Sequence, residues 1–136
     1  MQKKIDPHKH LTEILDAVNK RGNFRASVFA TDEGLVLSSN HNPQISEAKV
    51  GAMATLLAES AARAEAEVEM KDFKSLRISY GNGLILCRAL LVEGKVFLLI
   101  VLADPPANDE YSKYYDELLT WASDNGSDAL TELLTM

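Results

Sequence analysis

The residues of this sequence that could do chemistry are few and scattered. His8 and His10 form an H-x-H pair, which can bind zinc, but no third ligand follows at a suitable spacing. His41 lies in a polar stretch and has no serine or cysteine motif recognisably paired with it. We interpret these histidines as solvated side chains and predict no metal site.

Phosphate-binding loops and paired carboxylates are also missing. Neither GxxxxGK[ST] nor GxGxxG occurs, and Gly81-Asn82-Gly83 lies between two strand-like stretches, as a hairpin turn would. Glu65, Glu67 and Glu69 alternate along a predicted helix and mostly point to different faces, which is typical of a solvated surface. The sequence therefore predicts no enzyme, no catalytic residue and no cofactor.

Composition narrows the class of protein. The chain has 136 residues, 46% of them hydrophobic, which fits one domain (1–136) that buries its core without disulfides or metal. The net charge of −6 would repel phosphate backbones and disfavours nucleic acid as a partner. The lone Cys87 lies in the apolar run LILCRALLV, where a cysteine behaves as a small buried hydrophobe. With no disulfide framework, no signal sequence and no apolar run long enough to span a bilayer, we expect a cytoplasmic protein without membrane insertion.

The elements that would position any site follow from periodicity and turn signals. Asp6-Pro7 predicts the start of a helix that Gly22 ends, and residues 24–31 and 35–39 alternate as two strands around the turn Asp32-Glu33-Gly34. Ser46 caps a long helix over residues 46–69. Residues 75–80, 84–92 and 96–103 then form three strands, of which the last two are apolar enough to be the covered centre of the sheet.

The C-terminal part is predicted as a further helix with a tail. Asp109 can cap this helix, and Asn125-Gly126 is expected to stop it, leaving a short extra segment over residues 127–136. The element order is therefore α-β-β-α-β-β-β-α. It predicts an α+β fold in which a five-stranded antiparallel sheet lies between the long helix on one face and the terminal helices on the other, a profilin-like three-layer sandwich.

The long helix carries more apolar surface than its own sheet can cover. One stripe at helical spacing is expected to face that sheet: Val50, Met53, Leu57, Ala61, Ala64 and Val68. A second stripe consists only of small residues, which would let another backbone approach closely: Gly51, Thr55, Ala58 and Ala62. Two stripes predict two partners for this helix.

Three stretches of the chain, SVFATDEGLVLSS, GAMATLLAESA and LILCRALLVEGKVFLLIVLA, together with the order of elements, resemble a Roadblock/LC7 domain. The resemblance runs from about Leu11 to Trp121. It implies a homo- or heterodimer whose long helices pack side by side and whose third strands pair edge to edge. The implied dimer interface is formed by Gly51, Thr55, Ala58 and Ala62 of the helix and by Ser75, Arg77 and Ser79 of the strand.

The same resemblance implies a non-enzymatic regulator or scaffold that binds a Ras-like small GTPase, including the prokaryotic gliding type, or a light-chain-like adaptor. The GTPase would meet the outer face of the long helix, formed by Lys49, Ala52, Leu56, Glu59 and Arg63. Arg63 could act as an arginine finger, but we favour an ion pair with Glu59 or Glu67 at four-residue spacing.

The main alternative function is a small-molecule sensor domain, which needs an apolar cavity with a few polar anchors. Cys87 and Arg88 are the only polar interruptions of the interior strands, which gives this alternative little support. A small hydrolase or transferase is the third hypothesis, and no sequence motif supports it.

Overall fold

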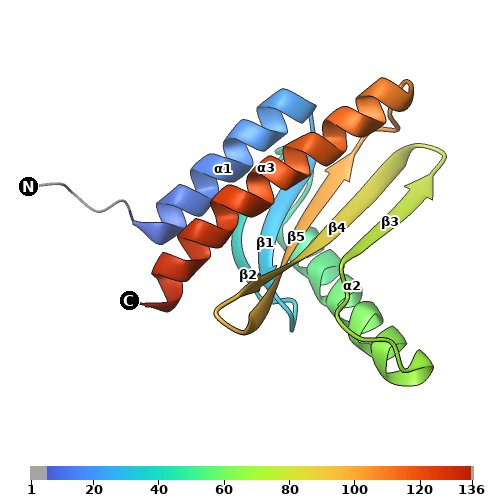
Figure 1. The fold of residues 1–136 in the computed structure, drawn as a ribbon. Helices are drawn as coiled ribbons and strands as arrows, with labels where there is room; N and C mark the ends of the chain where they lie inside the picture. The colour runs from blue at the N-terminus through green and yellow to red at the C-terminus, as the bar shows by residue number, and fades with distance from the viewer. Residues whose placement is uncertain (1–5, 136) are drawn as a thin grey trace, which may run out of the picture.

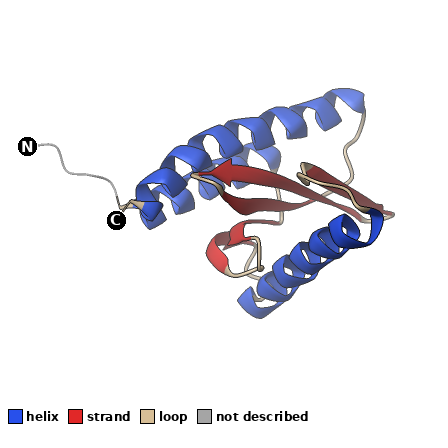
Figure 2. Ribbon diagram, turned by 60° about the horizontal axis from the view of Figure 1, so that its bottom comes forward, coloured by secondary structure: helices blue, strands red, loops and turns tan. Residues whose placement is uncertain are grey.

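The computed structural model describes residues 6–135, so residues 1–5 and Met136, the last residue of the predicted C-terminal segment, lie outside it. Eight elements follow in the predicted order: α1 (Pro7–Gly22), β1 (Ala26–Thr31), β2 (Val36–His41), α2 (Glu47–Val68), β3 (Ser75–Tyr80), β4 (Gly83–Val92), β5 (Lys95–Ala103) and α3 (Asp109–Leu134). The five strands form one antiparallel sheet in the order β2-β1-β5-β4-β3. Helices α1 and α3 lie side by side on one face and α2 lies on the other (Figures 1 and 2). The predicted α+β sandwich is confirmed.

The helix starts follow local capping chemistry. The Asp6 side chain accepts a hydrogen bond from the His8 backbone N–H at 3.0 Å, and Pro7 occupies the first helical position. Ser46 accepts from the Lys49 N–H at 3.2 Å and starts α2 as predicted. For α3 the capping residue is Asn108, which accepts from the Tyr111 N–H at 3.1 Å, so the prediction that Asp109 caps this helix is wrong by one residue.

The core consists of two clusters, one on each face of the sheet. The larger cluster lies under α1 and α3 and includes Leu15, Phe29 and Leu119. The smaller cluster lies under α2 and includes Val28, Leu57 and Ile100. Alternate residues of β1, β4 and β5 enter the two clusters, so these three interior strands are covered on both faces, as the apolar runs of β4 and β5 predicted.

Helix α3 does not stop at Asn125-Gly126, so the predicted helix stop is wrong. The helix continues to Leu134, and Ala129 and Leu130 are completely buried in the larger cluster. A Cβ atom on Gly126 would lie 2.6 Å from Cζ of Phe29, so this glycine lets α3 approach the sheet closely. A glycine in a helix interior destabilises the helix by about 1 kcal/mol, and the burial of this last part of α3 outweighs that cost.

Candidate interaction surfaces on α2 and β3

The face of α2 that contacts its own sheet is shorter than predicted. Val50 and Leu57 are buried as expected, and Ala54 is buried between them, although the predicted stripe omitted it. Val68 is 59% exposed and Ala64 is also exposed, so the prediction that these two residues face the sheet is wrong. Burial along α2 ends near the middle of this 22-residue helix, because its C-terminal half extends beyond the part that the sheet covers.

The stripe of small residues on α2 divides into buried and exposed positions. Ala58 is only 4% exposed and belongs to the core under α2, so the prediction that it faces a twin helix is wrong. Thr55 lies against the chain's own β1–β2 turn, since a Cβ on Gly34 would lie 2.5 Å from Cα of Thr55. Gly51 has open space where a Cβ would point, and Ala62 is exposed. Thr55 is nevertheless exposed, so Gly51, Thr55 and Ala62 remain accessible to a partner, whereas Ala58 does not.

The outer face of α2 is entirely exposed. It comprises the predicted partner-binding residues Lys49, Ala52, Leu56, Glu59 and Arg63. Leu56 is 63% exposed although its side chain is large and apolar. Nε of Arg63 lies 3.9 Å from Oε1 of Glu67, which is the ion pair that we favoured for this arginine. The pair is well exposed on both sides, so it leaves the guanidinium accessible.

Strand β3 is an edge strand. It pairs with β4 alone in the described part of the chain, and its other edge presents an unpaired row of backbone groups. Leu76 and Ile78 pack partly against the core under α2, as does Met53 of that helix. Ser75, Arg77 and Ser79 are exposed and alternate with them, so they lie on the opposite face. The structure thus adds Met53, Leu76 and Ile78 to the candidate surface. The alternation of apolar and polar residues in β3 was the sequence signal for Leu76 and Ile78.

A scan of the sequence against protein-family models found no match, and a search of curated proteins found none either. Solved structures do match. The gliding protein MglB from Thermus thermophilus aligns with a TM-score of 0.75 at 18% identity, covering 96% of this chain and 95% of that chain. A structure of MglB with a tetrameric arrangement gives 0.69 at 17% identity, covering 93% and 95%. A Roadblock/LC7 domain from Streptomyces avermitilis gives 0.66 at 15% identity, covering 92% and 98%.

The chain has the Roadblock/LC7 fold. The resemblance predicted from the three sequence stretches is therefore confirmed at the level of the fold. Each of these three alignments covers more than nine tenths of both chains.

Within this Roadblock/LC7 fold, burial raises the pKa values of two side chains, Cys87 and Tyr115. Burial raises the pKa of the Cys87 thiol to about 12, so the reactive thiolate is disfavoured at neutral pH. Burial and the nearby charge of Asp104 raise the pKa of Tyr115, whose hydroxyl donates to the Asp104 carbonyl at 3.3 Å. In residues 6–135 no group of three or more His, Cys, Asp or Glu side chains is placed to hold a metal ion.

Two hollows at the surface of the described residues differ from the apolar cavity that a sensor domain needs. One, of about 570 Å³, lies at the ends of β1 and β5 and is lined largely by polar residues, among them Arg25, Asn42, Gln44 and Asp104. The other, of about 130 Å³, lies between α2 and β5 next to Ala61 and Glu65. The first is polar and the second is smaller than the pockets of about 300–1,000 Å³ that bind drug-sized ligands. No helix of the described chain is both long and apolar enough to cross a membrane.

Proposed function

We propose that this protein is a non-enzymatic, homodimeric regulator or scaffold that binds a Ras-like small GTPase. The observation that carries the proposal is the unpaired edge of β3 beside the partly exposed apolar residues Leu76 and Ile78. The Roadblock/LC7 fold supports it, because the resemblance implies dimers that pair through this strand. The printed description of one similar structure as MglB with a tetrameric arrangement also supports self-association.

The sequence of β3 favours a second copy as the partner of its edge. Exposed edge strands tend to pair with other chains unless a proline, a bulge or several charges protect them. Strand β3 contains no proline and has a regular register with β4, and Arg77 is its only charged residue. An identical strand would satisfy its free backbone groups and cover Leu76 and Ile78.

The alternation of faces restricts how two copies of β3 can pair. Directly opposite residues in an antiparallel pair point to the same face, so with both α2 helices on one side Arg77 must oppose Ser75, Arg77 or Ser79. Placing Arg77 opposite its own copy would bring the Cβ atoms of two like-charged residues to about 5 Å, which is destabilising. Two registers avoid this, with either Leu76 or Ile78 opposite its own copy. Leu76 would pair only residues 75–77 of the two strands, whereas Ile78 pairs residues 76–80, so we place Ile78 opposite the Ile78 of the second copy, with Arg77 opposite Ser79.

Light scattering tests the dimer. We expect the wild-type protein to be dimeric at micromolar concentration and Ile78→Lys to be monomeric, because two ammonium groups would face each other across the interface. Leu91→Lys is the matched control, since Leu91 is 74% exposed on the same face of the sheet but on β4. A monomeric wild type, or an Ile78→Lys variant as dimeric as the control, would contradict the proposed interface.

The GTPase would bind the outer face of α2. Leu56 is the largest apolar residue on that face and Arg63 stays accessible beside it. We propose that this chain positions residues of the GTPase and contributes no arginine finger. The buried lone Cys87 suits a reducing compartment, so we place the protein in the cytoplasm.

Calorimetry with a purified Ras-like GTPase loaded with a non-hydrolysable GTP analogue tests this part. Leu56→Asp should weaken binding at least tenfold, since it removes an apolar contact and adds a charge. Leu91→Asp is an equally exposed control that should bind as the wild type does. Single-turnover hydrolysis with Arg63→Ala should stay within about twofold of the wild type, whereas removal of an arginine finger costs about a thousandfold.

A further inference from the structure

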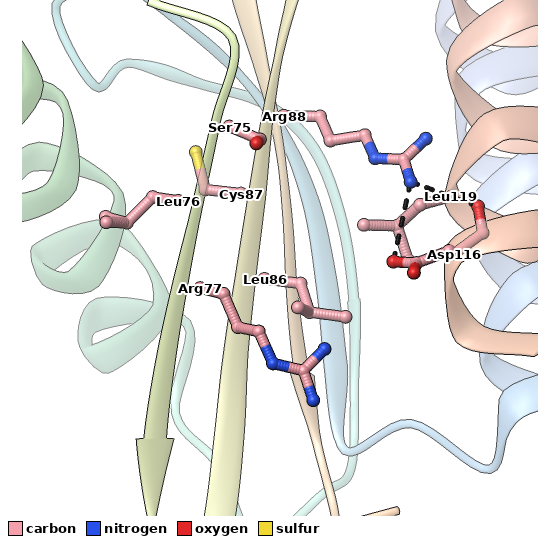
Figure 3. A pocket seen from close by; sticks show the side chains of 8 residues that line it. All are labelled: Ser75, Leu76, Arg77, Leu86, Cys87, Arg88, Asp116 and Leu119. Carbon is pink, nitrogen blue, oxygen red and sulfur yellow. Dashed lines mark hydrogen bonds and ion pairs between the residues drawn. The ribbon is translucent and has the colours of Figure 1, made fainter. Parts of the chain in front are cut away.

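A cleft of about 190 Å³ lies between β3, β4 and α3, on the face of the sheet opposite α2 (Figure 3). Helix α3 packs on β4 and leaves the neighbouring residues of β3 uncovered, so the cleft is open at the side of β3. Its floor is apolar, since Leu86 and Leu119 are both buried. Arg77 and Arg88 extend on the α3 side of the sheet, whereas Leu76 and Cys87 point away from it (Figure 3).

The two arginines differ in how they are held. Nη1 of Arg88 donates to Oγ1 of Thr120 at 2.6 Å, and Nη2 donates to the carbonyl of Asp116 at 3.2 Å. The Asp116 carboxylate lies 3.6 Å from Nη2 of Arg88. Arg77 makes neither an ion pair nor a side-chain hydrogen bond within residues 6–135. One guanidinium is therefore fixed by α3, and the other is free on the neighbouring strand β3.

The charge in this cleft is opposite to that of the protein as a whole. The chain carries a net charge of −6, yet the cleft holds two guanidinium groups and one carboxylate, which leaves one positive charge uncompensated. The apolar floor lowers the local dielectric and strengthens attraction to an anion. A planar guanidinium with free donors fits a carboxylate in a bidentate arrangement.

We propose that this cleft binds a carboxylate side chain on an acidic peptide segment of a protein partner. The single uncompensated charge matches a carboxylate better than a dianionic phosphate, which the Asp116 carboxylate would repel more strongly. The volume of the cleft admits one side chain rather than a nucleotide. All residues of the site belong to one chain, so the site does not depend on GTPase binding. Arg77 also lies on the edge strand of the proposed dimer, so light scattering on each variant separates a loss of peptide binding from a change of oligomeric state.

Fluorescence anisotropy with a labelled peptide of alternating Glu and Ala, measured at low ionic strength, tests the site. Wild-type protein should bind this peptide and should not bind the same peptide with Gln in place of Glu. Arg77→Gln should weaken binding about fivefold, as expected for a partly exposed ion pair. Asp116→Asn should strengthen binding by a similar factor, a gain that misfolding could not produce.

Lys49→Gln is the matched control, since it removes one positive charge from the opposite side of the sheet. The proposal is overturned if wild-type protein does not bind the Glu peptide, or if Arg77→Gln and Lys49→Gln weaken binding equally. It is also overturned if inorganic phosphate displaces the peptide at lower concentration than acetate does, because the site would then prefer a phosphoryl group. A chemical-shift change at Nε–Hε of Arg77 on peptide addition would support the assignment directly.

Discussion

The two faces of the sheet are covered unequally. Helices α1 and α3 together cover one face, where Leu15, Leu119 and Leu130 have almost no exposed surface. Helix α2 alone covers the other face, and Met53, Leu76 and Ile78 there stay partly exposed. The first face therefore carries the larger buried core, whereas the second leaves apolar surface that a partner can cover. The candidate surfaces for self-association and for the GTPase therefore both include α2.

The largest effect should separate two alanines of α2. Ala58→Glu places a carboxylate in the core under α2, so the free energy of unfolding should fall by about 3 kcal/mol or more. Ala62→Glu, on the exposed side of the same helix, should change the free energy of unfolding of the monomer by less than about 0.5 kcal/mol. Urea denaturation of both variants measures the difference. Equal stability of the two would show that α2 packs on the sheet in another rotation.

Two helical glycines should respond in opposite directions to alanine. Gly126→Ala forces a Cβ against Phe29 and should destabilise the protein by about 1–3 kcal/mol. Gly51→Ala meets no atom within 4 Å and should stabilise it by up to about 1 kcal/mol, since alanine is the better helix former. Thermal unfolding of both variants checks this. A stabilising Gly126→Ala would mean that α3 does not approach β1 as closely as described.

Another effect should appear only at high pH. Burial raises the pKa of Cys87 from 9.0 to about 12, so the folded state keeps the proton that the unfolded state loses. Stability from this group is complete below pH 9 and should decrease by about 1.4 kcal/mol per pH unit as the pH rises toward 12. Cys87→Ala should remove this component of the slope in urea titrations at alkaline pH. An unchanged slope would show that the thiol ionises normally.

The fold could be predicted because its signals are local. Alternating residues in β3, apolar runs in β4 and β5 and the caps at Asp6 and Ser46 each specify an element regardless of what packs on it. The end of α3 could not be predicted in this way. Asn125-Gly126 is a stop signal by local propensity, and only the packing of Gly126 on Phe29, about a hundred residues away in the sequence, overrides it.

The candidate site was predicted less well for a similar reason. Periodicity correctly placed Val50 and Leu57 on one face of α2, but it does not tell where along the helix the sheet ends, so Val68 was assigned to the core although it is exposed. A stripe of small residues also does not specify its neighbour. In the structure Thr55 meets Gly34 of its own chain and Ala58 faces its own sheet.

The central claim is that the free edge of β3 pairs with a second copy around Ile78. Cysteine cross-linking under mild oxidation tests it most directly, because the native Cys87 is buried and should not react. Ile78→Cys should form a disulfide-linked dimer rapidly, since opposite residues of an antiparallel pair lie about 5 Å apart. Arg77→Cys should not, because its copies would be offset by two residues along the strands. Efficient cross-linking of Arg77→Cys, or none at Ile78→Cys, would contradict the account.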